Sequence, residues 1–156
     1  MKKRQRDVQL VEIAGRNWLV SQLIQCGVEV AKPERDKGVD LIAYVETQRF
    51  KACRIQIKVS TDSAFVAYRE KYSGMLMVYI WHIDDSQRTV AFAMNALQAR
   101  RIVKANEWDQ NDCWTRRGGY WRVPRIGINS NFYKDHLYRH KMDLKTWKAT
   151  ILRASN

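Results

Sequence analysis

The segment from Gly38 to Ser60 constrains the fold of this chain more than any other part. Along its second half, apolar and polar residues alternate: Cys53, Ile55, Ile57 and Val59 have one parity, and Arg54, Gln56, Lys58 and Ser60 have the other. Because side chains alternate between the two faces of a sheet, this pattern predicts a strand at 52–60. Gln56 and Lys58 then lie on one face, about 7 Å apart.

The first half of the segment predicts a second strand at 38–45, in which Asp40 stands among apolar residues. If the two strands form an antiparallel hairpin that turns near Gln48, positions 40 and 56 are equidistant from the turn and lie opposite each other. The hairpin therefore brings an acid, an amide and a lysine to one face of a sheet. Such a group suits hydrolysis of a phosphodiester bond.

The charge of the chain indicates a polyanionic partner. The sequence has 156 residues, and we expect one domain over 1–156. Its net charge is +12, from 28 Lys and Arg residues shared equally between the two halves of the chain. This exceeds the roughly 2–8 that solubility requires of a small domain, so a nucleic acid is favoured over a merely solubilising surface.

The sequence contains no sign of membrane insertion. No apolar run approaches the roughly 18 residues that span a bilayer. Asp7, Gln9 and Glu12 interrupt the segment after the basic N-terminus, where a signal peptide would have its apolar core. We expect no membrane partner and a cytoplasmic location.

The remaining periodicity predicts a mixed α/β domain around a central sheet. We expect helices at 7–25, 94–105 and 134–152, further strands at 28–31, 75–81 and 89–93, and strand character around 120–123. The three cysteines are scattered and indicate small apolar residues rather than a zinc site. His136 and His140 have a spacing that can bind metal on a helix, but they lack the intervening glutamate of an HExxH motif.

An acid on the first helix (Glu12), G-x-D on one strand (Gly38 to Asp40) and Q-x-K on the next (Gln56 to Lys58) resemble the PD-(D/E)XK nuclease superfamily. That superfamily includes restriction enzymes, junction resolvases and a few small homing endonucleases. The resemblance covers residues 8–60 closely and the rest loosely, and Val39 stands where the name-giving motif has proline. It implies a restriction-endonuclease-like fold, α/β with a mixed central sheet flanked by helices.

The resemblance also implies a metal-dependent endonuclease that hydrolyses DNA, with a role for each residue. Asp40, the Gln56 side-chain oxygen, the Ile57 carbonyl and Glu12 would hold Mg²⁺ (or Mn²⁺), a cation that prefers oxygen ligands. Lys58 would position the attacking water and stabilise charge on the phosphate. Because glutamine replaces a carboxylate, cation affinity falls. The alternative is a non-catalytic nucleic-acid-binding protein that kept the nuclease fold.

Each candidate residue also has a structural interpretation. Glu12 lies four residues before Arg16 and could form a helical ion pair. Asp40 could cap the turn at Gly38. Gln56 and Lys58 could be ordinary solvent-facing strand residues.

Two segments are candidate DNA contacts, and we expect a double-stranded partner. The first contains Arg116, Arg117, Tyr120, Arg122 and Arg125, which could bind phosphates and bases, or form a basic turn over the core. We expect this segment to lie on the same side of the domain as the Asp40–Lys58 group. The second is Ser60 and Thr61, whose hydroxyls could bind a phosphate, or belong to an ordinary strand-ending turn. A homo-oligomer (dimer or tetramer) would let one small domain act on both strands.

Overall fold

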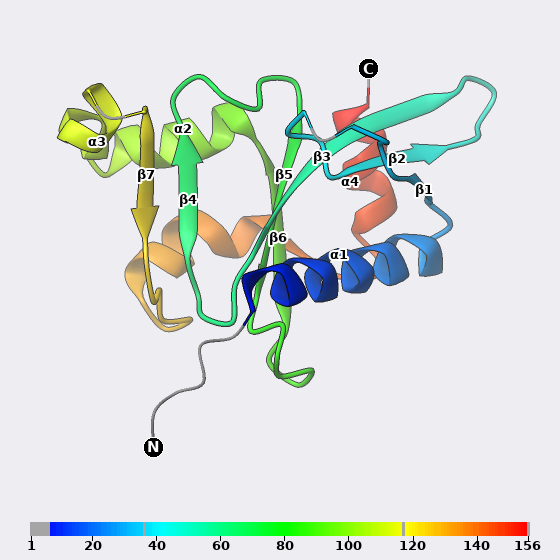
Figure 1. The fold of residues 1–156 in the computed structure, drawn as a ribbon, viewed down its shortest axis with the longest axis horizontal. Helices are drawn as coiled ribbons and strands as arrows, with labels where there is room; N and C mark the ends of the chain where they lie inside the picture. The colour runs from blue at the N-terminus through cyan, green and yellow to red at the C-terminus, as the bar shows by residue number, and fades with distance from the viewer. Residues whose placement is uncertain (1–6, 36, 117, 156) are drawn as a thin grey trace.

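The computed structural model describes residues 7–35, 37–116 and 118–155, and its centre is a six-stranded mixed sheet (Figure 1). The strand order is β1-β2-β3-β5-β6-β8. The strands span Glu29–Ala31 (β1), Leu41–Val45 (β2), Lys51–Val59 (β3), Leu76–Trp81 (β5), Val90–Asn95 (β6) and Lys141–Met142 (β8). The mixed α/β architecture expected from the sequence is therefore present.

The hairpin of β2 and β3 has the register expected from the sequence. Leu41 pairs with Ile55, and the Asp40 amide donates to the Ile55 carbonyl at 2.9 Å, so Asp40 stands opposite Gln56 just before β2 begins. On its other side, β3 runs parallel to β5, and Ile57 pairs with Val78. Parallel strands need a long crossover, which residues 60–75 provide.

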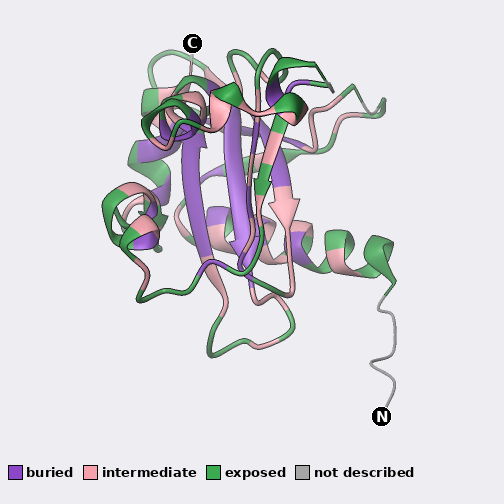
Figure 2. Cartoon of the chain, turned by 90° about the vertical axis from the view of Figure 1, so that its left-hand side faces the viewer, coloured by how far each residue is buried: buried purple, intermediate pink, exposed green. Residues whose placement is uncertain are grey.

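Two hydrophobic clusters fill the two sides of the sheet. Along β5, Leu76, Val78 and Ile80 join one cluster, and Met77, Tyr79 and Trp81 join the other. All six residues of β5 are buried, as Figure 2 shows for the strands at the centre of the molecule. A strand covered on both faces reads as a continuous apolar run, which is why Met75–Trp81 shows no alternation.

Helices and a small second sheet cover these faces. The first cluster includes residues of α1 (Val8–Gln25) and α4 (Trp147–Ala154). The second includes residues of α2 (Ala96–Ala105) and of a two-stranded sheet formed by β4 (Phe65–Tyr68) and β7 (Tyr120–Val123). Strands β4 and β7 run side by side, next to α2 and α3 (Asp112–Thr115) (Figure 1). A 3-10 turn, η1 (Trp108–Gln110), lies between these two helices in sequence.

Helix α1 packs closely against the sheet at Gly15. A Cβ atom at this position would lie 2.3 Å from Val59 Cγ2 and 2.6 Å from Val59 Cγ1. The helix begins after Asp7, whose side chain accepts from the Gln9 amide, and it ends near Gly27, which has φ +70°. The absent side chain of Gly15 therefore sets the distance between α1 and β3.

The expected helix at 134–152 is wrong. Residues Tyr133–Leu137 form a π-helical turn (η2), Tyr138–His140 form a 3-10 turn (η3), β8 follows, and only α4 is a regular helix. Leu137 packs in the second cluster, whereas Trp147 and Ile151 pack in the first. Because these apolar residues lie on opposite sides of the sheet, a single helix could not bury all of them. The chain instead crosses from one side to the other through β8, which pairs with the edge of the sheet.

Other boundaries differ by smaller amounts. Strand β2 starts at Leu41 rather than at 38, and α2 starts at Ala96 rather than at 94 because Asn95 and Gln98 form a capping box before it. Strand β4 was not expected. Within the described residues, no helix is both long enough and apolar enough to cross a membrane.

Candidate functional site

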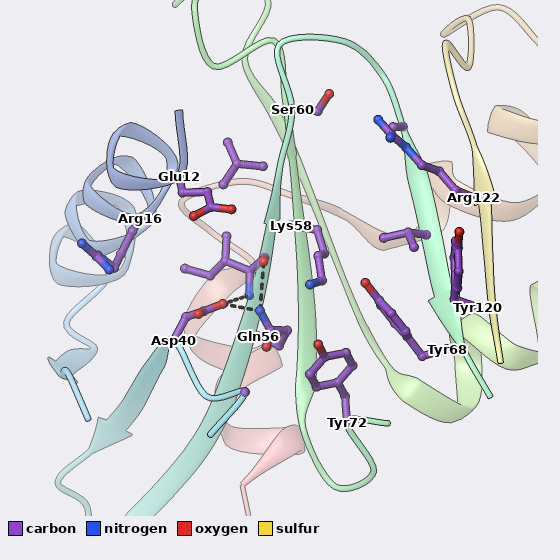
Figure 3. Close-up of a pocket in the computed structure, with 15 residues that line it drawn as sticks. Glu12, Arg16, Asp40, Gln56, Lys58, Ser60, Tyr68, Tyr72, Tyr120 and Arg122 are labelled. Carbon is purple, nitrogen blue, oxygen red and sulfur yellow. Dashed lines mark hydrogen bonds between the residues drawn. The ribbon is translucent and has the colours of Figure 1, made fainter. Parts of the chain in front are cut away.

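A cleft of about 780 Å³ lies between the β3 strand and the sheet of β4 and β7 (Figure 3). Helix α1 contributes Glu12 and Arg16, the β2–β3 hairpin contributes Asp40, Gln56, Ile57 and Lys58, and Ser60 follows β3. The opposite wall contains Val66 and Tyr68 from β4 and Tyr120 and Arg122 from β7. All four residues expected to be catalytic therefore line one cleft.

Asp40 is held by two hydrogen bonds from β3. Its Oδ2 atom accepts from Gln56 Nε2 at 2.5 Å and from the Ile57 amide at 2.6 Å. Both contacts follow from the strand register, which places Asp40 opposite Gln56 and next to the Ile57 amide. The carboxylate is fixed at the floor of the cleft, and Oδ1 has no hydrogen bond within the described residues.

The Gln56 amide has the opposite orientation to the one expected. We expected its oxygen to face a metal, but Nε2 faces Asp40 and also donates to the Ile57 carbonyl at 3.2 Å. Its Oε1 atom lies toward Gly38, 3.8 Å from where a Cβ atom would be. The reason is electrostatic: an amide oxygen in the Nε2 position would face two other oxygens, whereas the NH₂ group satisfies both.

Lys58 is positioned by aromatic rings rather than by an acid. Its Nζ atom lies 5.2 Å from the centre of the Tyr68 ring and 5.3 Å from that of the Tyr72 ring. The two rings meet edge to face, with centroids 4.9 Å apart. Ring faces attract a cation by their quadrupole, so the tyrosines hold the ammonium group inside the cleft without neutralising it.

Glu12 extends from α1 toward β3 (Figure 3). It lines the cleft together with Arg16, but no ion pair joins the two side chains within the described part of the chain. Gly15, one turn further along α1, allows the helix to approach Val59 of β3. The close approach at Gly15 therefore determines how near Glu12 comes to the hairpin.

The small sheet presents its polar face to the cleft. Tyr120 pairs with Tyr68, and Arg122 pairs with Val66, so these four side chains share one face of β4 and β7. The other face packs Phe65, Ala67, Trp121 and Val123 in the second cluster. Burial raises the pKa of Tyr68, with nearby Tyr120 adding to the shift and Arg122 opposing it.

The expected DNA-contacting residues do not form one surface. Tyr120, Arg122 and Ser60 line the cleft, but Arg125 lines a separate cavity of about 830 Å³. Arg122 and Arg125 are three positions apart, so a regular strand would already place them on opposite faces, and Arg125 lies beyond the end of β7 in a left-handed conformation with φ +52°.

Arg116 and Thr61 are also not among the residues that line the cleft. Arg116 is exposed at the end of α3, 3.8 Å from Asp112. The Thr61 carbonyl lies 3.3 Å from His82 Nδ1. Arg117 lies outside the described residues.

Sequence reasoning missed Tyr68 and Tyr72. Phe65-Val66-Ala67-Tyr68 is apolar or aromatic throughout, so the face on which Tyr68 lies is evident only from the burial along β4 in the structure. Tyr72 had no signal in the sequence either, since it follows the strand in a turn and has φ +64°. In the described residues, no three His, Cys, Asp or Glu side chains gather as a metal site, so the cleft has only Glu12 and Asp40 as acids beside the Gln56 amide.

Comparison of the chain with protein-family models, curated proteins and solved structures gave no match.

Proposed function

We propose that this chain is a metal-dependent endonuclease that hydrolyses DNA and has a restriction-endonuclease-like fold. The observation that carries the proposal is the meeting of Asp40, Gln56 and Ile57 at the β2–β3 hairpin, with Glu12 and Lys58 lining the same cleft. The order of these residues in the sequence matches the motif that suggested the function. The net charge of +12 supports a nucleic-acid substrate.

The donor set fits a hard divalent cation. Asp40 and Glu12 supply carboxylates, Ile57 supplies a backbone carbonyl and Gln56 supplies an amide oxygen in its other orientation, and Mg²⁺ prefers oxygen ligands. The Gln56 NH₂ group bridges the Asp40 carboxylate and the Ile57 carbonyl, so a partial positive charge already stands between two of the proposed ligands. When bound, the cation would stabilise charge on the phosphate and activate water.

The chain's own residues would contribute position and charge. Lys58 would hold its ammonium group beside the phosphate, where negative charge increases as water adds to phosphorus. The tyrosine rings keep this group oriented, because they attract it without forming a salt bridge that would compete with the phosphate. Arg122, on the opposite wall, would bind a neighbouring phosphate.

The orientation of Gln56 favours a second candidate function, a non-catalytic DNA-binding protein with a nuclease fold. Asp40, Gln56 and the Ile57 carbonyl satisfy one another without a cation. Since these hydrogen bonds would have to break before a cation binds, the affinity of the site for metal is lower. This candidate predicts salt-sensitive DNA binding without cutting.

A cleavage assay separates the two candidates. Supercoiled plasmid and end-labelled DNA are incubated with the protein in Mg²⁺, Mn²⁺ or EDTA. We expect cutting that depends on the divalent ion and that Asp40→Asn and Lys58→Ala reduce by at least about 100-fold, since charge-stabilising groups contribute on this scale.

The matched control is Lys104→Ala, which removes an equal charge from the exposed end of α2. This variant should cut at the parent rate. DNA binding without cutting in any ion would reject the endonuclease and leave the binding protein.

A further inference from the structure

The cleft wall opposite Asp40 contains an aromatic ring that the hydrolytic chemistry does not use. Tyr120 and Arg122 project from β7 on the face that lines the cleft, while Trp121 between them packs inward. Figure 3 shows Tyr120 and Arg122 on the side of the cleft that faces Lys58. A phosphate-binding wall needs cations, so an aromatic side chain here calls for another explanation.

Tyr120 differs from the two other tyrosines of the cleft. Tyr68 and Tyr72 contact each other and the Lys58 ammonium group, whereas within the described residues Tyr120 makes no ring–ring or cation–π contact. Tyr120 is 44% exposed, whereas Val66 and Tyr68 on the paired strand pack against the second cluster. Its ring can therefore receive a planar group that enters the cleft.

The position of this ring fits a base close to the reacting phosphate. Tyr120 pairs with Tyr68 across one strand spacing of about 4.8 Å. The Tyr68 ring centre is 5.2 Å from Lys58 Nζ. Tyr120 thus lies one strand beyond the ring that contacts the ammonium group, so a base stacked on it would belong to a nucleotide near the phosphate that Lys58 holds.

Only an unpaired base can present its face to this ring. In a continuous duplex each base is covered above and below by its neighbours, whereas bases of single strands, loops and junctions have exposed faces that stack on aromatic side chains. Arg122, two residues along the same strand face, would bind the phosphate next to that base. An aromatic ring and a cation side by side are typical of surfaces that bind single-stranded nucleic acid.

Building on the proposed nuclease function, we propose that the substrate is DNA with an unpaired nucleotide beside the phosphate to be cut, as at a fork or branch. Tyr120 stacks on the unpaired base and Arg122 binds the adjacent phosphate. This narrows the expected double-stranded partner to DNA that also has an unpaired nucleotide, and it makes Tyr120 a specificity-determining residue.

Binding is tested in EDTA, so the result does not depend on catalysis. Two DNAs of the same sequence contain 2-aminopurine at one position, unpaired at the junction of a fork in the first and paired within a duplex in the second. We expect the protein to bind the fork at least about 10-fold more tightly and to quench its fluorescence. Tyr120→Ala should weaken fork binding by about 5- to 100-fold and remove the quenching, whereas Tyr120→Phe should keep both.

Three controls separate stacking from other effects. Tyr138→Ala removes a tyrosine that is exposed outside the cleft and should leave fork binding unchanged. Tyr120 is largely exposed, so the Tyr120→Ala protein should unfold at the parent temperature. A fork of the same sequence made of RNA should bind no more tightly than the DNA fork.

The outcomes distinguish this inference from the proposed function. Equal binding of fork and duplex, fork binding that Tyr120→Ala does not change, or preference for RNA would each overturn it. Cutting of continuous duplex at the same rate as the fork in Mg²⁺ would overturn it while leaving the nuclease intact. Quenched, Tyr120-dependent fork binding without cutting in any ion would support the substrate class and reject the nuclease.

Discussion

Replacing Gly15 with alanine should destabilise the protein, and shortening Val59 to alanine should remove most of that loss of stability. The new Cβ atom would lie 2.3 Å from one γ-carbon of Val59 and 2.6 Å from the other, against the 3.5–4.0 Å or so at which carbon atoms normally meet. The helix, the strand or both must therefore move by about 1 Å. Valine has little freedom to turn away because its χ1 angle is restricted.

The magnitude follows from two opposing terms. Forcing extra carbon into a packed contact costs about 1–3 kcal/mol. Replacing glycine inside a helix by alanine returns about 0.5–1 kcal/mol. The net loss should be about 1–2 kcal/mol, and in a chain of this length the melting temperature Tm should fall by about 2–8 °C.

The assay is a double-mutant cycle measured by denaturant and thermal unfolding. Val59→Ala removes both γ-carbons but leaves the Cβ atom of residue 59, which lies 3.0 Å from the new Cβ atom. In that background Gly15→Ala should change the stability little, because the helix term of about 0.5–1 kcal/mol offsets the remaining tight contact. The coupling between the two positions should then be about 1–2 kcal/mol. If Gly15→Ala stabilises the parent protein, or has the same effect in both backgrounds, the close approach of α1 to β3 is not what Gly15 provides.

Four further predictions concern single groups. Gln56→Glu removes a hydrogen-bond donor to Asp40, so in EDTA the free energy of unfolding should fall by about 1–3 kcal/mol and Tm should fall with it. Mg²⁺ should raise the Tm of the variant more than that of the parent. Glu12→Gln should slow cleavage while DNA binding stays equal or tightens, because a negative charge at the cleft is lost; an unchanged rate would leave Glu12 without a role in the site. Burial raises the pKa of Cys53 to about 11, so its thiol should resist alkylation near pH 8 until the protein is unfolded, as mass spectrometry can follow. Burial, and to a lesser extent the nearby Arg139, hold the pKa of His140 below its usual 6.5. The unfolded chain therefore binds this proton more readily than the folded one, so the free energy of unfolding should fall as pH drops below about 6.5. His140→Gln should make the free energy of unfolding depend less on pH in this range.

The β2–β3 hairpin could be predicted from the sequence because its determinants are local. The alternation from Cys53 to Ser60 fixes which side chains face the core, and the short turn fixes the register, so Asp40 meets Gln56 as expected. A shift by one residue would turn Gln56 and Lys58 into the hydrophobic cluster. The sequence does not predict the amide orientation of Gln56, since that orientation depends on the positions of the Ile57 carbonyl and Gly38 in the folded hairpin.

The opposite wall of the cleft was decided by tertiary structure. Strands β4 and β7 pair across more than 50 positions of sequence, for example Tyr68 with Tyr120, and no local pattern specifies such a partner. The same limit explains the closing segment, in which Leu137 and Ile151 have helical spacing but pack on opposite sides of the sheet. Sequence periodicity indicates which residues are apolar, but it does not indicate in which of the two hydrophobic clusters they pack. The sequence by itself therefore determined the acid, amide and lysine of the hairpin, and the folded chain determined which side chains face them.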